Sequence, residues 1–122
     1  MAEDEYRKIA DGQVLKKLGS GLEIVRRKKH EWTPELGSLS GEPLRRITDK
    51  IHGSKFLPQW NLVFYVQWIE EQLTLLGWDR HTGPGSHTID LADPVGYSNG
   101  KAVRRITIVL SSRVVHAYPV ES

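Results

Sequence analysis

The chain of 122 residues contains no cysteine. This absence excludes disulfide bonds, thiolate-bound zinc and a cysteine nucleophile, and it leaves the redox compartment open. The sequence also lacks a long apolar run, because its most apolar segment, from Gln59 to Trp78, contains Glu70 and Glu71. The charged N-terminus has no apolar core of the kind found in secretory signals, so we expect no signal peptide.

The composition is that of an ordinary globular domain. Hydrophobic residues make up 39% of the chain and charged residues 26%, which argues against wholesale disorder. A chain of this length can form one stable hydrophobic core without disulfide bonds or structural metal ions. We therefore expect a single domain over residues 1–122, with a helical part over about residues 1–78 and a sheet part over about residues 79–122.

The spacing of apolar residues predicts helices first and strands last. We expect helices over Glu3–Leu18, Pro43–Ile51 and Gln59–Trp78, strands over Leu22–Val25 and His87–Ala92, and loops over Thr33–Glu42, Asp79–Ser86 and Asp93–Gly100. With a C-terminal hairpin, these elements indicate an α+β fold in which N-terminal helices pack on one face of a roughly four-stranded antiparallel sheet.

The hairpin is expected over Ala102–Val120, where two β-branched runs flank Ser111 and Ser112. If these two serines form the turn, the expected cross-strand pairs are Thr107 with His116 and Arg105 with Tyr118. Side chains alternate between the faces of a strand. One face would carry Ile106, Ile108, Leu110, Val115 and Ala117 against the long helix, and the other would carry Arg105, Thr107, His116 and Tyr118. The second face combines a cation, a hydroxyl, an imidazole and a phenol, which suits chemistry on a phosphodiester.

Positive charge is unevenly distributed, although the net charge is only +2. Acidic residues gather elsewhere, as at Glu70 and Glu71. Such segregation suits a polyanionic partner, whereas the alternative is a solvated charged face with no specific partner. The candidate nucleic-acid-binding residues are Arg26, Arg27, Lys28, Lys29, His30, Arg45, Arg46 and Arg104.

Two segments resemble a known family. The ending RVVHAYPV (113–120), preceded by RRITIVL (104–110), is similar to the last hairpin of bacterial EndoU-type ribonuclease toxin domains, and KFLPQW (55–60) before a long helix resembles their Phe-Pro-x-x-Trp-like element. The resemblance implies membership of the barnase–EndoU–colicin–RelE group, which combines N-terminal helices with a four-stranded antiparallel sheet. It also implies metal-independent cleavage of RNA.

The chain departs from the family pattern at the catalytic positions. The family has two upstream histidines, the second in a glycine-rich stretch, whereas here only His30 and His52 lie upstream and the glycine-rich stretch is reduced to His52-Gly53-Ser54. The family's third catalytic position, usually threonine or serine, falls on His116.

Cleavage of RNA through its 2′-hydroxyl requires a base, an acid and a cation at the phosphate. Two histidines can supply the base and the acid without a metal. His116 is the first choice because the expected register places it beside Arg105 and Tyr118, and His52 is preferred to His87 as its partner. The full candidate catalytic set is His116, His52, Tyr118, Arg105, Thr107, Lys55 and His87.

We expect no cofactor and no metal site. His81 and His87 lie six residues apart in a turn-rich loop, without the helical spacing or the carboxylate cluster of a zinc enzyme. The expected partners are RNA, with tRNA among the candidates, and a cognate inhibitor or immunity protein. If the chain is a delivered toxin domain, it acts in the cytoplasm.

Two alternatives to a ribonuclease stay open. One is a non-catalytic nucleic-acid-binding module that uses the same basic surface. The other is a protein-interaction domain, such as an immunity or adaptor protein, in which the four tryptophans include a partner contact. The oligomeric state is left open by the sequence.

Overall fold

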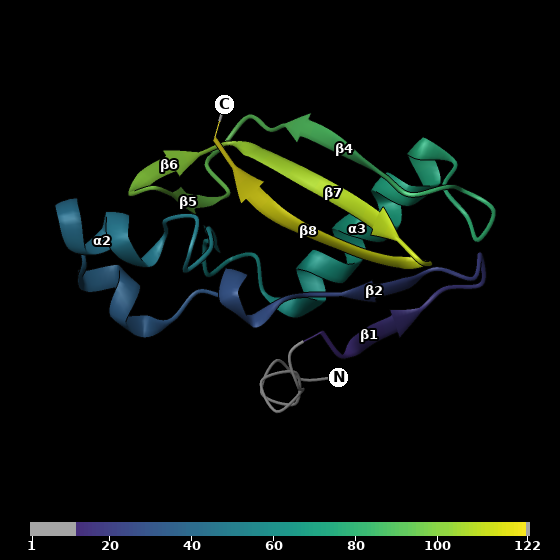
Figure 1. Ribbon diagram of the computed structural model, residues 1–122, viewed down its shortest axis with the longest axis horizontal. Helices are drawn as coiled ribbons and strands as arrows, with labels where there is room; N and C mark the ends of the chain where they lie inside the picture. The colour runs from purple at the N-terminus through teal and green to yellow at the C-terminus, as the bar shows by residue number, and fades with distance from the viewer. Residues whose placement is uncertain (1–11, 122) are drawn as a thin grey trace. The chain divides into compact units, whose positions relative to one another are not determined.

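The computed structural model describes residues 12–121 and has an α+β fold, as expected (Figure 1). Its elements in chain order are β1 (Val14–Lys17), β2 (Glu23–Val25), η1 (Lys28–His30), η2 (Pro34–Ser38), α2 (Gly41–Ile47), β3 (Lys55–Phe56), α3 (Leu62–Leu76), β4 (Gly85–Asp90), β5 (Gly96–Ser98), β6 (Lys101–Val103), β7 (Arg105–Ser111) and β8 (Val114–Val120). No helix within the described range is long and apolar enough to cross a membrane.

The strands form two sheets in the described part of the chain. One has five strands in the order β1-β2-β8-β7-β4, and the other has three in the order β3-β5-β6. The larger sheet is mixed, because β2 runs parallel to β8, with Ile24 opposite Val115. It therefore differs from the four antiparallel strands expected from the sequence. The parallel pair joins segments far apart in the chain, which local patterns do not predict.

The expected helix over Glu3–Leu18 is wrong at its C-terminal end. Residues 14–17 form β1 instead, and β1 pairs antiparallel with β2, placing Lys17 opposite Glu23. The backbone groups of this short segment are satisfied by the neighbouring strand, which overrides its helical apolar spacing. The rest of the expected helix, residues 3–11, lies outside the described residues.

The chain divides into two compact units. The first comprises residues 1–27, 59–87 and 108–117, and it contains α3 with β1 and β2. The second comprises residues 28–58, 88–107 and 118–122, and it contains α2 with the three-stranded sheet. Strands β4, β7 and β8 contribute residues to both units.

Helix α3 forms the centre of the first unit and confirms the long helix expected between Gln59 and Trp78. The Asn61 side chain caps its start by accepting the N–H of Phe64 at 2.9 Å, and Gly77 ends it with a φ of 69°. Its buried residues are Leu62, Tyr65, Val66, Trp68, Ile69 and Leu73.

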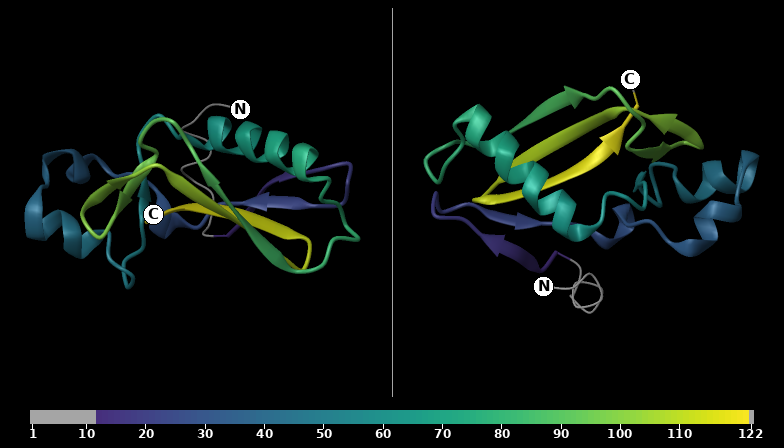
Figure 2. Two further views of the ribbon diagram at one scale, coloured as in Figure 1. Left: turned by 90° about the horizontal axis from the view of Figure 1, so that it is seen from above. Right: turned by 180° about the vertical axis from the view of Figure 1, so that it is seen from behind.

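The Tyr65 hydroxyl ties α3 to the sheet. It donates to the Val25 carbonyl at 2.5 Å and accepts the Ala117 N–H at 3.0 Å. Figure 2 shows α3 running beside this part of β8. Because Tyr65 is fully buried, its two hydrogen bonds fix the helix at a specific position on β2 and β8.

The hairpin turn lies one residue later than the sequence suggested. Strand β7 ends at Ser111 and β8 begins at Val114, and the turn residues Ser112 and Arg113 have φ angles of 50° and 67°. The expected cross-strand pairs are therefore wrong. Counting outward from the turn, Val109 now lies opposite His116 and Thr107 opposite Tyr118.

The predicted faces of the hairpin are nevertheless correct. Moving the turn by one residue gives each residue of β7 a partner two positions later in β8. Because side chains alternate with a period of two, every side chain stays on its expected face. The buried set is Ile106, Ile108, Leu110, Val115 and Ala117, and the opposite set, Arg105, Thr107, His116 and Tyr118, is partly exposed.

The second unit contains several elements that were expected as loops. The 3-10 helix η2 and the start of α2 lie within Thr33–Glu42, and β5 lies within Asp93–Gly100. Buried Thr48, just after α2, organises this region. Its Oγ1 accepts the Gly100 N–H at 2.8 Å, and its carbonyl accepts the Asn99 N–H at 2.8 Å. These bonds fix the β5–β6 turn against the end of α2.

Candidate functional site

The second unit gathers basic side chains around the segment from His52 to Lys55. We call Lys29, His30, His52 and Lys55 the basic cluster. Lys55 lies on β3 with only 9% of its surface exposed, and its Nζ donates to the carbonyls of His52 and Gly53, both at 2.8 Å. Burial and the nearby charge of Lys29 lower the pKa of Lys55, although Asp49 opposes this effect.

Lys29 lies close to this segment because Gly53 has no side chain. A Cβ atom on Gly53 would lie 3.1 Å from Cγ of Lys29 and 3.3 Å from the Lys29 carbonyl oxygen. The φ of Gly53 is 89°, a left-handed conformation that glycine adopts without strain. Glycine is therefore needed here both for the turn and for the close approach of η1.

His52 has the environment of an oriented base. Its side chain is 59% exposed, and its Nδ1 lies 3.0 Å from Oδ1 of Asp49. The same oxygen accepts the backbone N–H groups of Ile51 and His52, and chiefly the His52 N–H lowers the pKa of Asp49. Because an ionised carboxylate can only accept, Nδ1 carries the hydrogen and Nε2 is left as the basic nitrogen.

His30 joins the cluster from η1. Its Nδ1 lies 2.7 Å from the Ser54 carbonyl oxygen and 3.4 Å from Ser54 Oγ, so the ring is anchored two residues from His52. The ring also stacks on Tyr118 of β8, with centroids 5.1 Å apart and an interplanar angle of 13°. His30 is only 5% exposed, which does not fit its expected role as a surface phosphate contact.

The remaining candidates on the hairpin face have other contact partners than the residues of the basic cluster. Arg105 forms an ion pair with Asp90 at 2.5 Å, and the Thr107 hydroxyl lies 2.9 Å from the Thr88 hydroxyl. The Arg105 hydrogen bond lowers the pKa of Asp90, so the charge of this arginine is compensated. His116 on β8 and exposed His87 on β4 belong to the first unit, whereas the basic cluster belongs to the second.

The predicted nucleic-acid contacts divide into buried, paired and exposed groups. Arg26 is 7% exposed, donates to the Trp60 carbonyl at 2.6 Å and lies over the Tyr65 ring, so its expected surface role is wrong. Its guanidinium instead satisfies a carbonyl inside the first unit. Arg45 and Arg46 face Glu42, and the remaining exposed candidates are Arg27, Lys28, Lys29 and Arg104.

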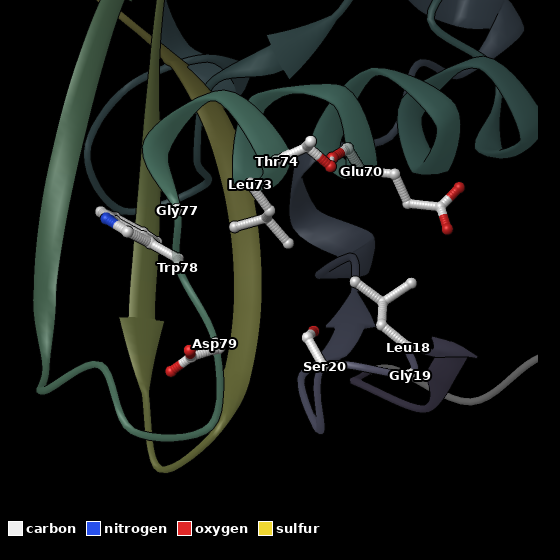
Figure 3. A pocket seen from close by; sticks show the side chains of 9 residues that line it. All are labelled: Leu18, Gly19, Ser20, Glu70, Leu73, Thr74, Gly77, Trp78 and Asp79. Atoms are coloured by element: carbon white, nitrogen blue, oxygen red, sulfur yellow. Dashed lines mark hydrogen bonds between the residues drawn. The ribbon is translucent and has the colours of Figure 1, made fainter.

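The first unit contains a separate hollow between the β1–β2 turn and the end of α3 (Figure 3). Its volume is about 420 Å³, and its lining includes Leu18, Leu73 and Trp78 with the carboxylates of Glu70 and Asp79. Glu70 is paired with Lys16 at 2.8 Å. None of the predicted catalytic residues lines this hollow.

Asp49 and Ser54 were missed by the sequence reasoning. An aspartate three residues before a histidine in a turn is a detectable signal, because Asp commonly accepts backbone N–H groups just after itself. The contact of Ser54 with His30 spans 24 residues and has no local signal. Among residues 12–121 no group of three or more His, Cys, Asp and Glu side chains could hold a metal ion.

Comparison of the chain with protein-family models, curated proteins and solved structures finds no match.

Proposed function

We propose that this protein is a metal-independent endoribonuclease that works through the basic cluster. The observation that carries the proposal is an exposed imidazole, His52, oriented by Asp49, in the same turn whose backbone carbonyl accepts the Lys55 ammonium, which lies near the charge of Lys29. Two like charges held near each other favour a dianionic or polyanionic ligand over an empty site. A phosphodiester beside an oriented base is the ligand that uses all three groups.

The residues assign a role to each part of the reaction. Nε2 of His52 removes the proton of the 2′-hydroxyl, whose oxygen attacks the adjacent phosphorus. Lys29 stabilises the negative charge that develops on the phosphoryl oxygens. The bond from phosphorus to the 5′-oxygen then breaks, and that oxygen needs a proton.

Lys55 is the proposed source of this proton. An ammonium has three hydrogens, and the carbonyls of His52 and Gly53 accept two of them. The lowered pKa makes Lys55 a stronger acid than an ordinary lysine. Proton transfer from Lys55 to the leaving oxygen and from the 2′-hydroxyl to His52 balances the reaction without a metal.

Cleavage of a fluorescent single-stranded oligoribonucleotide tests this assignment. His52→Gln is expected to reduce the cleavage rate by about a hundredfold or more, while changing RNA binding less than about twofold. His81→Gln is the matched control, because His81 is an exposed histidine in the first unit. Cleavage by His52→Gln at the rate of the unmodified protein would overturn the assignment.

His116 stays a prediction from the sequence and needs its own variant. If His116→Gln abolishes cleavage and His52→Gln does not, the base lies on β8 rather than in the basic cluster. If neither variant loses activity, acid–base catalysis by these histidines is wrong.

A non-catalytic RNA-binding module is the second candidate. It is favoured by the exposed basic residues of η1, Lys28 and Lys29, which can contact phosphates without any chemistry. This function predicts salt-dependent RNA affinity and no cleavage at any enzyme concentration. A protein-interaction domain predicts neither RNA affinity nor cleavage.

A further inference from the structure

An aromatic pair lies in the second unit beside the segment that carries the basic cluster. The rings of Trp32 and Tyr97 have centroids 6.2 Å apart and are tilted by 35°. Both residues are partly exposed. Trp32 lies two residues after His30, the last residue of η1, whereas Tyr97 lies on β5.

The register of the three-stranded sheet connects Tyr97 to Lys55. These two residues are opposite each other in the β3–β5 pair, and Tyr97 is opposite Ala102 in the β5–β6 pair. Directly opposed residues of antiparallel strands project from the same face of the sheet. Lys55, Tyr97 and Ala102 therefore form one row, and the small side chain of exposed Ala102 leaves space beside the tyrosine ring.

The geometry points to a nucleobase-binding platform formed by Trp32 and Tyr97, which receives an unstacked base of single-stranded RNA. This inference rests on the proposed function and specifies its substrate. Bases stack on partly exposed aromatic rings in proteins that bind single-stranded nucleic acid, and the neighbouring cations contact the phosphates. Here the exposed neighbouring cation is Lys29, three residues before Trp32, whereas Lys55, directly opposite Tyr97, is buried.

Duplex RNA does not satisfy such a platform. Its bases are already paired and stacked, so only its backbone could contact the basic cluster. We therefore expect preference for single strands, and loops rather than stems within a folded RNA.

Binding is best measured with a short 2′-O-methyl oligoribonucleotide, because its blocked 2′-oxygen prevents cleavage. Trp32→Ala and Tyr97→Ala are each expected to weaken binding by about tenfold. Trp32→Phe should retain part of the affinity, since it keeps an aromatic ring. Phe64→Leu is the matched control, because Phe64 is an aromatic residue of the first unit with 43% of its surface exposed.

An abasic form of the same oligonucleotide separates stacking from an indirect effect on folding. If the platform exists, the unmodified protein binds the abasic probe more weakly, and Trp32→Ala causes little further loss. Intrinsic fluorescence gives a second readout, because Trp60 and Trp68 are buried, and of the partly exposed Trp32 and Trp78 only Trp32 belongs to the second unit. RNA should quench the unmodified protein more strongly than Trp32→Phe.

Three results overturn the platform. Unchanged affinity in both alanine variants, with cleavage intact, removes the platform and leaves the proposed function standing. Equal losses on the normal and abasic probes show that Trp32 acts through folding. Absence of RNA binding by the unmodified protein removes the platform and the proposed function together.

Discussion

Lys55 is held where its own charge is disfavoured. Its ammonium is buried and lies near the charge of Lys29, while two backbone carbonyls accept its hydrogens and Asp49 acts on it more weakly. Charged groups in such positions commonly belong to functional sites, because the structure that holds them must be stabilised elsewhere. The environment of Lys55 therefore links the stability of the protein to pH at the site proposed to bind RNA.

The pH dependence of stability tests the environment of Lys55. Its pKa is lowered in the folded protein below the ordinary 10.5, so between the two values the unfolded chain binds more protons. The free energy of unfolding should then rise with pH across that window, and the full penalty is present below the folded pKa. Urea titrations at increasing pH should show this contribution in the unmodified protein and not in Lys55→Met.

Lys29→Met is the matched control for this titration. It removes part of the cause of the shift, so the rise should become smaller without vanishing. Parallel curves for the unmodified protein and Lys55→Met across the alkaline range would contradict the lowered pKa.

Tyr65 is a second residue whose removal has a defined consequence. Tyr65→Phe keeps the ring but leaves the Val25 carbonyl and the Ala117 N–H without this partner inside the protein. We expect a loss of about 1–3 kcal/mol in the free energy of unfolding, with an unchanged denaturant slope. A loss below about 0.5 kcal/mol would mean that the hydroxyl does not anchor α3 to the sheet.

At the scale of elements, the C-terminal hairpin shows what local patterns can determine. The alternation of apolar and polar residues in β7 and β8 correctly predicted which side chains are buried, because every second residue of a strand lies on the same face and one face is buried. It did not predict the turn, because Ser112 and Arg113 are not typical residues for the left-handed conformations they adopt. Nearby Ser111 was an equally plausible turn residue from sequence alone.

Replacing the turn by Asn-Gly tests its position. The double variant Ser112→Asn, Arg113→Gly supplies the residues that a two-residue turn with positive φ prefers, so it should raise stability by about 1 kcal/mol. Thermal unfolding measures the change. If Ser111 and Ser112 formed the turn instead, glycine at position 113 would lie in β8 and lower stability.

The same contrast applies to the elements that build the candidate site. The long helix α3 was predictable from its length and apolar content. In contrast, β2 pairs in parallel with residues of β8 that lie 91 positions later, which no local signal indicates. His52 and Lys55 were predicted together because they are close in sequence, and their catalytic roles stay a prediction. His30 was assigned to the surface, because its contacts with Ser54 and Tyr118 depend on tertiary structure.

At the scale of the whole molecule, a net charge of +2 is too small to bind RNA through overall attraction. The proposed RNA affinity must therefore come from local groups such as the basic cluster. The logarithm of the RNA affinity should fall linearly with the logarithm of the salt concentration, with about 0.7 units of slope for each phosphate neutralised.

Lys29→Met should lower this slope by about 0.7 if Lys29 contacts one phosphate. Lys17→Met is the control, because Lys17 is an exposed lysine of β1 in the first unit. Equal slopes for the unmodified protein and Lys29→Met would exclude Lys29 as a phosphate contact.

Identification of the RNA ends after incubation with the purified protein tests the central claim most directly. Attack by the 2′-hydroxyl predicts fragments with 2′,3′-cyclic phosphate and 5′-hydroxyl ends, formed at the same rate with and without EDTA. Intact RNA, fragments with 3′-hydroxyl and 5′-phosphate ends, or inhibition by EDTA would contradict a metal-independent ribonuclease.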